Sequence, residues 1–417
     1  MPTNLNLTSE EINSLVKEYG TPLQLYDGRL IIENQQYFID TMKKYFPTFR
    51  QYFAVKALPN PHILNLLIKH GSFLDCSSAI ELKIAESAGL FGEQIMFTSN
   101  YTSIDDLKYA KKLNAIINLD DISLIDDLAS LGEMPELLCF RLNPGIGKTD
   151  SETKSNILGG PDAKFGIPPF QIVEAYQKAK HLGVKRFGIH MMTGSNVLTL
   201  EYWNELIDIL FEIIVNIRKN TGSSSSNPEF INIGGGIGIP YKWDIPKIDI
   251  QKFVETISIK INEKIKLYQI PEPRLYMECG RFITGPYGWL ISKCNVIKNT
   301  YQKYYGLDAC MSNLMRPGMY GAYHEISILG KDNEEKENAN VVGTLCENND
   351  WFAKNRELPK ANIGDIFIIH DTGAHSHSMG FQYNGKLRAP EVLIDLDNKP
   401  KLIRRRENID DYLSTII

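Results

Sequence analysis

Short runs of apolar and β-branched residues recur along the first two thirds of the chain, and longer segments with helical periodicity separate them. Short apolar runs bounded by polar residues predict buried strands, whereas apolar residues spaced three and four apart predict amphipathic helices. We therefore expect eight strands before residue 280. They are YFAV (52–55), SFLD (72–75), IMFT (95–98), AIIN (115–118), LLCFRL (137–142), FGIHMM (187–192), FINI (230–233) and RLYME (274–278).

Helical segments lie between consecutive predicted strands, and one more helix, at about 31–45, precedes the first strand. Alternation of this kind predicts parallel strands joined by crossover helices. Eight strands within about 230 residues fit a (β/α)₈ barrel better than an open doubly wound sheet, although spacing alone leaves the open sheet as an alternative. The expected crossover helices lie near 61–70, 79–89, 104–113, 122–131, 169–182, 200–219 and 250–267.

The pattern changes after about residue 280, where helical periodicity fades and short strand-like runs alternate with turn residues. This predicts a mostly β domain of sandwich or barrel type. An N-terminal run, TPLQLYD (21–27), is expected to supply its first strand. We therefore predict a barrel over 30–280 and a β domain made of 1–29 and 281–417. The later strands are expected in GWLISKCNVIKNT (288–300), VVGTLC (341–346), IFIIHD (366–371) and EVLIDLD (391–397).

Composition excludes several classes of protein. Hydrophobic residues make up 43% of the 417 residues and charged residues 23%, which is ordinary for a globular protein. The net charge of −5 does not indicate the basic surface that nucleic-acid-binding proteins have. The densest apolar stretch, LIDILFEIIVNI (206–217), is interrupted by acids, so we expect no membrane span. GSSSSN (222–227) predicts an exposed loop.

The N-terminal sequence and the cysteines predict a cytoplasmic protein. MPTNLNLTSEEINSLVKEYG has neither the basic and apolar regions of a secretory signal nor the Arg-rich character of a transit peptide. The six cysteines form no CxxC pair, and a chain of this length does not need disulfides to fold. We therefore expect reduced thiols.

Lys56 is the first candidate for chemistry, because it directly follows the first predicted strand in FAVKALPNPHIL. Active sites of barrels lie at the C-terminal ends of the strands. A lysine that points into the barrel mouth there would have a lowered pKa and would be able to attack a carbonyl group. The simpler alternative is a lysine that has left the strand for solvent, and the local pattern alone favours it.

Two motifs follow the last two predicted strands of the barrel. INIGGGIGIPY (231–241) places three glycines where barrels often bind phosphate, and glycine lets backbone N–H groups approach an anion. It is not a GxGxxG motif, and a tight turn is the alternative. In MECGRFITGPYG (277–288), Glu278 would be able to hold a protonated ring nitrogen and Arg281 a phosphate or carboxylate. A structural ion pair is an equal alternative for these two residues.

Three more clusters lie in the predicted β domain. MRPGMYGAYHEI (315–326) offers Arg316 and Tyr320, and TLCENND (344–350) places a thiol beside a carboxylate. HDTGAHSHSMGFQYNG (370–385) carries an HxH pair, which suggests metal ligands on one face of a strand. A third ligand at a suitable spacing is missing, so we expect no metal.

Taken in order, these motifs resemble those of the fold-type III pyridoxal-phosphate-dependent decarboxylases, the group that includes diaminopimelate, ornithine and arginine decarboxylases. The resemblance covers nearly the whole chain. Each motif alone is weak, but six in the family's order at predicted strand ends are specific. RPGMYGAYHEI and YNGKLRAPEVL most resemble the diaminopimelate decarboxylase branch. The six motifs are AVKA with Lys56, the loop of Gly234, Gly235 and Gly236, ECGR with Glu278, Gly280 and Arg281, RPGMY with Arg316 and Tyr320, CENND with Cys346 and Glu347, and SMGFQYN with Tyr383.

The resemblance implies that pyridoxal 5′-phosphate is the cofactor. Lys56 would bond it covalently through its amine, and Glu278 would hold its ring nitrogen in the protonated form. The cofactor phosphate and ring would also contact Ser195, Gly234, Gly235, Gly236, Gly280, Arg281 and Tyr383.

The resemblance also implies the substrate site and the assembly. Arg316, Tyr320 and Glu347 would bind the far end of the substrate, with Arg281 and Tyr383 nearby, and Cys346 would return a proton to the product. In the family, the cysteine and the glutamate come from a second subunit. A homodimer with shared active sites is therefore implied.

Three residues depart from the family pattern, and one of them is Cys279, which makes ECGR of the family's EPGR. The family places a histidine under the cofactor ring, but GIHMMTGSN has Met192 at that position and His190 two residues earlier. Either Met192 packs against the ring, since thioethers make favourable contacts with aromatic rings, or His190 substitutes. His375 stands where the family has an aromatic residue.

We expect decarboxylation of meso-2,6-diaminopimelate to L-lysine. Related substrates are the alternatives within the enzyme class: D-lysine or D-ornithine, carboxynorspermidine, or a carrier-bound glutamyl group. A cofactor-free binding protein of the same fold is an alternative from another class, against which Lys56, the glycine loop and Cys346 argue. A metal-dependent hydrolase built on His375 and His377 is a weaker third option.

Overall fold

The computed structural model describes residues 5–150, 157–222 and 226–417. The chain forms two compact units. The barrel unit contains Asn34–Gly238 and Ile248–Gly280, and the β unit contains Met1–Glu33, Ile239–Lys247 and Arg281–Ile417. Half of the loop predicted at GSSSSN lies outside the described residues, because 223–225 are not among them.

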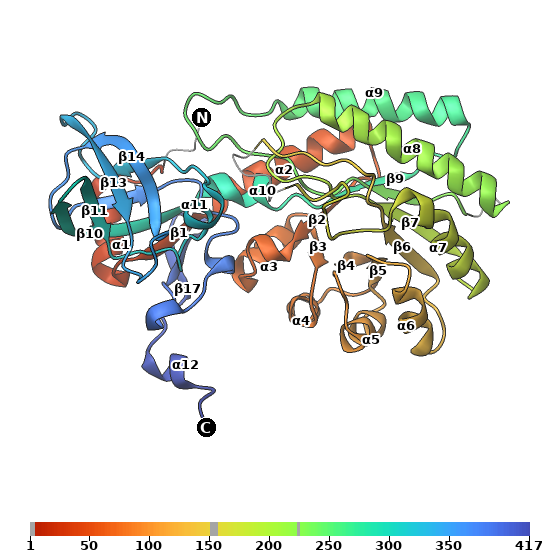
Figure 1. Cartoon of the computed structure of the whole chain (residues 1–417), viewed down its shortest axis with the longest axis horizontal. Coiled ribbons are helices and arrows are strands. Elements are labelled where there is room, and N and C mark those ends of the chain that lie inside the picture. The colour runs from red at the N-terminus through yellow and green to blue at the C-terminus, as the bar shows by residue number, and fades with distance from the viewer. Residues whose placement is uncertain (1–4, 151–156, 223–225) are drawn as a thin grey trace. The chain divides into compact units, whose positions relative to one another are not determined.

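In the described part of the barrel unit, eight parallel strands close into a barrel in the order β2 to β9 (Figure 1). The predicted (β/α)₈ barrel is thus confirmed, and the open sheet is wrong. The strands are β2 (Arg50–Ala54), β3 (Phe73–Cys76), β4 (Ile95–Thr98), β5 (Ile116–Leu119), β6 (Leu137–Arg141), β7 (Arg186–His190), β8 (Phe230–Asn232) and β9 (Arg274–Met277).

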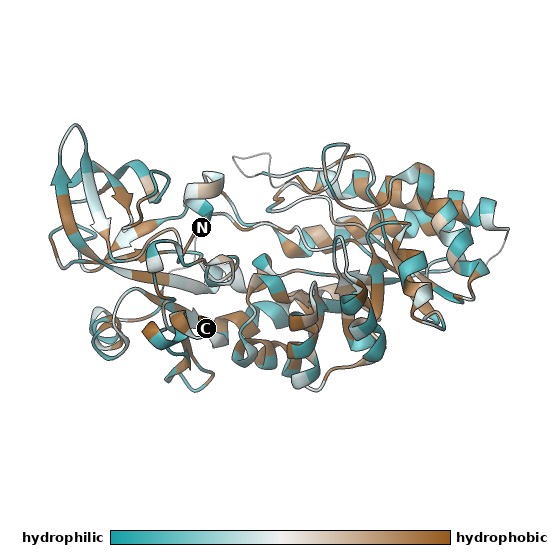
Figure 2. Ribbon diagram, turned by 60° about the horizontal axis from the view of Figure 1, so that its bottom comes forward, coloured by the Kyte–Doolittle hydropathy of each residue, from teal (hydrophilic) through white to brown (hydrophobic). Residues whose placement is uncertain are grey.

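Four of the helices around the barrel begin at polar capping residues. The side chains of Asn60, Ser78, Ser103 and Asp249 each accept a hydrogen bond from a backbone N–H in the first turn. Figure 2 shows polar and apolar residues on the same helices, as expected for helices that cover a barrel. The helices are α2 (Gly28–Tyr45), α3 (Pro61–Lys69), α4 (Ala79–Ser87), α5 (Ile104–Lys112), α6 (Leu124–Ser130), α7 (Pro169–His181), α8 (Glu201–Thr221) and α9 (Ile250–Tyr268).

The interior of the barrel is layered because every second strand residue points inward. A central apolar layer includes Tyr52, Phe230 and Tyr276, and the last two rings stack with their centroids 4.4 Å apart. A Cβ atom on Gly188 would lie 2.0 Å from the Phe230 ring, so this position needs glycine. The inward positions one step towards the C-terminal ends are polar: Asp75, Thr98, Asn118, Arg141, His190, Asn232 and Glu278.

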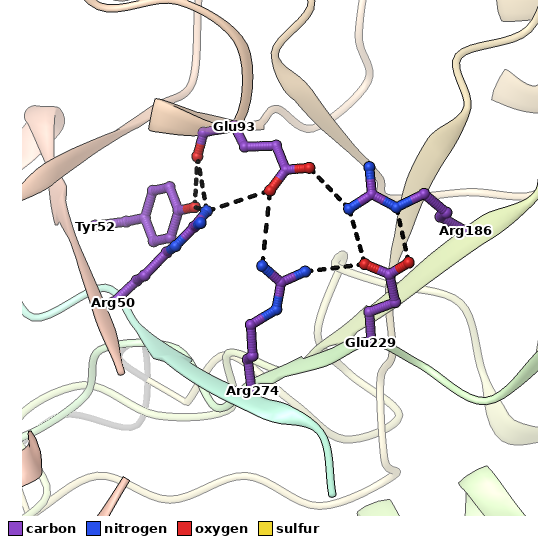
Figure 3. Close-up of polar contacts among 6 residues, drawn as sticks. All are labelled: Arg50, Tyr52, Glu93, Arg186, Glu229 and Arg274. Carbon is purple, nitrogen blue, oxygen red and sulfur yellow. Dashed lines mark hydrogen bonds and ion pairs between the residues drawn. The ribbon is translucent and has the colours of Figure 1, made fainter. Parts of the chain in front are cut away.

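Charged residues form a cluster at the other end of the barrel, where the strands begin (Figure 3). Glu229 accepts two hydrogen bonds from Arg186, at 2.7 and 2.8 Å, and one from Arg274 at 2.9 Å. Glu93 pairs with Arg186 at 2.8 Å and with Arg50 at 3.3 Å. The alternating charges tie together the starts of strands β2, β7 and β9 and the turn before β4.

Glu93→Gln should destabilise the barrel at neutral pH and much less in acid. Burial raises the pKa of Glu93, but the Arg186, Arg50 and Arg274 charges lower it below its usual range overall. A lowered pKa stabilises the fold above the unfolded value near 4.3, and the effect disappears as the pH falls through the folded value. We expect a loss of about 1–2 kcal/mol in the free energy of unfolding at pH 7, because the pairs are partly exposed.

Urea unfolding at pH 7 and at successively lower pH values measures this difference, with the exposed Glu133→Gln as the matched control. A loss that does not shrink as the pH falls, or no loss at pH 7, would contradict a stabilising role for the cluster.

The β unit is built around a mixed sheet that in the described residues has nine strands. The N-terminal β1 pairs antiparallel with β10 and parallel with β16, as the sequence predicted for a β domain that takes an N-terminal strand. Its strands are β1 (Leu23–Asp27), β10 (Gly288–Asn299), β11 (Lys303–Leu307), β12 (Ile326–Ile328), β13 (Lys336–Val342), β14 (Trp351–Pro359), β15 (Ile366–Ile369), β16 (Glu391–Ile394) and β17 (Pro400–Arg404).

Four short helices complete the β unit in the described residues: α1 (Ser9–Tyr19), α10 (Arg281–Thr284), α11 (Arg316–Tyr320) and α12 (Ile409–Leu413). Ile12 and Leu15 of α1 pack in one apolar cluster with Leu25 and Trp289. No described helix in either unit is long and apolar enough to cross a membrane.

Candidate active site

Lys56 lies in a single 3₁₀ turn, Val55–Ala57, that directly follows β2 rather than on the strand itself. Its Nζ is 3.3 Å from Oδ2 of Asp75, and its side chain is 47% exposed, whereas that of Asp75 is fully buried. Burial alone would lower the pKa of Lys56, but the Asp75 and Glu278 charges raise it overall. The lowered pKa expected from the sequence is therefore wrong in this arrangement, because the charges of the acidic groups outweigh the effect of burial.

Glu278 follows β9 and is held in the barrel by residues at the ends of two neighbouring strands. Asn232 donates a hydrogen bond from Nδ2 at 2.7 Å, and His190 Nε2 lies 3.3 Å from the carboxylate. Burial would raise the pKa of Glu278, but the charge and hydrogen bond of His190 and the charge of Lys56 lower it overall. Burial and the charge of Glu278 in turn raise the pKa of Asp75. Glu278 is therefore the carboxylate that stays ionised, as a partner of a protonated ring nitrogen must.

Glycines after β8 and β9 leave no room for side chains. A Cβ on Gly235 would lie 2.5 Å from the carbonyl oxygen of Glu278, and a Cβ on Gly280 would lie 2.6 Å from the Cβ of Ala57. Gly234 and Gly236 have positive φ values of 75° and 78°. These positions therefore need glycine, because a side chain would collide with neighbouring atoms or strain the backbone.

His190 and Met192, the two candidates from the sequence for packing against the cofactor ring, lie in different surroundings. His190 is fully buried as the last residue of β7, and its Nε2 is engaged by Glu278. Met192 lies two residues beyond the strand and is only partly buried, and its sulfur accepts a hydrogen bond from Gly235 N at 3.3 Å. Ser195 lies in the same loop, where its carbonyl oxygen accepts from Thr149 Oγ1 at 2.7 Å. Of the two, Met192 is the side chain placed beside the glycine loop.

Arg281 and Arg316 lie in the β unit, on either side of Tyr241. Arg281 Nη1 donates to the Tyr241 hydroxyl at 2.6 Å. The Arg316 guanidinium lies over the Tyr241 ring, 4.4 Å from its centroid, and contacts His324 Nε2 at 2.7 Å. Tyr320 ends the same short helix, α11, and is partly buried. This part of the β unit thus brings together two of the arginines singled out in the sequence.

Two exposed loops of the β unit hold Cys346, Glu347 and Tyr383 together. Cys346 N donates to Asn384 Oδ1 at 2.7 Å, and the Tyr383 hydroxyl donates to the Cys346 carbonyl at 3.4 Å. The predicted strand over 341–346 ends at Val342, because the buried Asp350 carboxylate draws the following chain into a loop by accepting from Leu345 N at 2.7 Å. The loop leaves the Cys346 thiol and the Glu347 carboxylate exposed.

His377 of the HxH pair makes polar contacts within the β unit. His377 contacts the Ala389 carbonyl through Nε2 at 3.2 Å and Arg388 through Nδ1 at 3.0 Å. His375 has a left-handed backbone with φ of 56°. Among the described residues, no group of three or more His, Cys, Asp or Glu side chains is arranged to hold a metal ion.

Several polar residues of the site were not singled out in the sequence. In the barrel they are Asp75, Arg141 and Asn232, each at an inward position near the end of a strand. Counting two residues on from an inward apolar residue would have found them, as Asn232 follows Phe230 and Arg141 follows Cys139. In the β unit they are Tyr241 and His324, and no local pattern marks them.

Comparisons with known proteins agree with this geometry. Residues 33–285 match the family described as pyridoxal-dependent decarboxylase, pyridoxal binding domain. The chain is 40% identical to Protein TabA of Pseudomonas amygdali pv. tabaci over 97% of this chain and 93% of that protein. It is 34% identical to the diaminopimelate decarboxylase of Methanothermobacter thermautotrophicus, over 96% and 92% of the two chains.

Solved structures extend the likeness to both units. The diaminopimelate decarboxylase of M. jannaschii in complex with L-lysine has a TM-score of 0.88 and 30% identity, covering 97% of this chain and 94% of that one. The family match covers more than half of the chain, and the curated relatives match it at full length. The chain therefore belongs to the pyridoxal-dependent decarboxylases, and it is an amino-acid decarboxylase that uses pyridoxal phosphate.

Proposed function

We propose that this enzyme removes carbon dioxide from meso-2,6-diaminopimelate and releases L-lysine. The observation that carries the proposal is the environment of Arg316. Its guanidinium is buried, it contacts the ring nitrogen of His324, and it forms no ion pair with any described carboxylate. A buried cation of this kind is costly unless an anion pairs with it. The carboxylate at the far end of diaminopimelate would supply that anion, and the similarity to diaminopimelate decarboxylases supports the same substrate.

The barrel residues would hold the cofactor, whose ring accepts the electrons released when the carboxylate leaves as carbon dioxide. Lys56 would bond it, and the ionised Glu278 would keep a proton on the ring nitrogen. The loop of Gly234, Gly235 and Gly236, with Ser195 and Gly280, would hold the phosphate. Met192 would cover one face of the ring.

The residues of the β unit would select the substrate and handle a proton. Arg316 would bind the distal carboxylate, with Tyr320 and Arg281 beside it, and Glu347 would bind the distal ammonium. Cys346 would donate the proton that replaces carbon dioxide on the α-carbon, and Tyr383 would fix the Cys346 loop. The exposed positions of Cys346 and Glu347 support a homodimer in which these residues complete the partner's site.

The cysteines support a cytoplasmic enzyme. All six are free thiols, and five of them are buried. Reduced thiols of this kind persist in a reducing compartment.

Purified holoenzyme should release carbon dioxide fastest from meso-diaminopimelate. We expect its kcat/KM to exceed those for D-lysine, D-ornithine and carboxynorspermidine by at least about 100-fold, because each lacks one of the charged groups that the site would pair. The similarity to Protein TabA favours a second candidate, a decarboxylase for a related amino acid, so the panel must include these compounds. A faster reaction with another member of the panel would overturn the proposed substrate.

A further inference from the structure

His324 is the direct partner of the Arg316 guanidinium, and its own hydrogen bonds define its protonation. His324 is fully buried, with Nδ1 2.8 Å from the carbonyl oxygen of His370 and Nε2 2.7 Å from Arg316 Nη1. A carbonyl oxygen only accepts and a guanidinium only donates. Nδ1 must therefore carry the hydrogen, and Nε2 must offer a lone pair to Arg316.

The surroundings keep the His324 ring neutral. Burial and the charge of Arg316, together with those of Arg281 and Arg356, lower the pKa of His324 well below its usual range, against the hydrogen bond to the His370 carbonyl. The charge of Asp371 acts on Arg316 and raises the pKa of the guanidinium, but burial lowers that pKa overall. The direct contacts of the Arg316 guanidinium in the described residues are thus with uncharged groups, His324 and the Tyr241 ring. The charges of Arg281 and Asp371 also act on it, in opposite directions.

An uncharged partner has a consequence that a carboxylate would not have. A glutamate at this position would hold Arg316 more firmly, but it would neutralise the charge that an incoming carboxylate needs. An aliphatic residue would leave the charge but remove the acceptor, so that the guanidinium would lose its orientation. Only a neutral acceptor fixes Arg316 and leaves its charge available.

We propose that His324 is a positioning residue that holds Arg316 through a neutral acceptor, so that the full guanidinium charge is available to the substrate's distal carboxylate. The inference rests on the proposed function of Arg316 as the binder of that carboxylate. It predicts that a glutamate at position 324, which would pair more strongly with Arg316, weakens substrate binding. A merely structural role of His324 would not predict this.

Three substitutions test this in the holoenzyme: His324→Gln, His324→Leu and His324→Glu. His324→Gln keeps a neutral acceptor and should leave the KM for meso-diaminopimelate and the Kd for L-lysine within about 3-fold of wild type. His324→Glu should raise both constants at least about 10-fold, with a smaller change in kcat. The absorption spectrum of the bound cofactor should be unchanged in all three. The exposed His181→Glu is the control for a general effect of the added charge.

The outcomes separate the inference from the proposed function. Equal L-lysine binding by His324→Glu and His324→Gln would overturn the role of His324. If Arg316→Ala itself keeps the wild-type Kd for L-lysine, the proposed role of Arg316 falls as well. Should His324→Glu fail to fold, the remaining pair decides, because His324→Leu must weaken L-lysine binding while His324→Gln must not.

Discussion

Lys56→Ala should abolish decarboxylation, with a loss of at least about 10³-fold in kcat. The Lys56 side chain lies just beyond β2 and is half-exposed, and its amine is 3.3 Å from Asp75. The charge of Glu278 also raises the pKa of this amine. An amine in that position would carry the covalent link to the cofactor, and alanine has no group to replace it. The visible absorption band of the lysine-linked cofactor should disappear with the activity.

Spectra and turnover of three variants check this expectation. Lys69→Ala removes an exposed lysine at the end of α3 and should leave both unchanged. Lys56→Arg keeps the positive charge beside Asp75, but its guanidinium is not a nucleophile, so it should be as inactive as Lys56→Ala. Normal turnover by either Lys56 variant would overturn the assignment of the whole site.

The strands of the barrel could be predicted from the sequence because each is short and buried on both sides. Runs such as IMFT and FINI contain almost only residues that favour strands, and the helices between them have clear periodicity. The β unit was harder, because its strands are partly exposed. In β14, WFAKNRELP mixes buried and exposed residues without regular alternation, and no strand was predicted there. Helix α1 was also missed, although Thr8 and Glu11 form a capping box that is visible in the sequence.

The candidate site followed from motifs, but its electrostatics did not. The sequence placed Lys56 and Glu278 at strand ends, but the contact of Asp75 with the lysine was not predicted, and it reverses the direction of the expected pKa shift. The choice between His190 and Met192 likewise needed the strand register, which places His190 beside Glu278. Contacts such as that of His324 with Arg316 depend on the tertiary path of a loop and leave no periodic trace.

The proposed sharing of sites between subunits makes a quantitative prediction for mixed dimers. Lys56 belongs to the barrel unit and Glu347 to the β unit, and we propose that each active site takes them from different chains. Lys56→Ala and Glu347→Ala homodimers should then both be nearly inactive. After refolding as an equal mixture, half of the dimers should be mixed, and one of the two sites in each mixed dimer should be intact. Activity should recover to about a quarter of the wild-type value if association is random.

A second pair provides the matched control. Lys56 and Glu278 both lie in the barrel unit, so a mixture of Lys56→Ala and Glu278→Ala leaves every site with one damaged barrel. That mixture should stay inactive under the conditions in which the first pair recovers. Mass spectrometry of the intact dimers establishes that mixing has occurred. Mixed dimers without recovered activity in the first pair would mean that each chain completes its own site, and the exposed Cys346 and Glu347 loop would then need a different explanation.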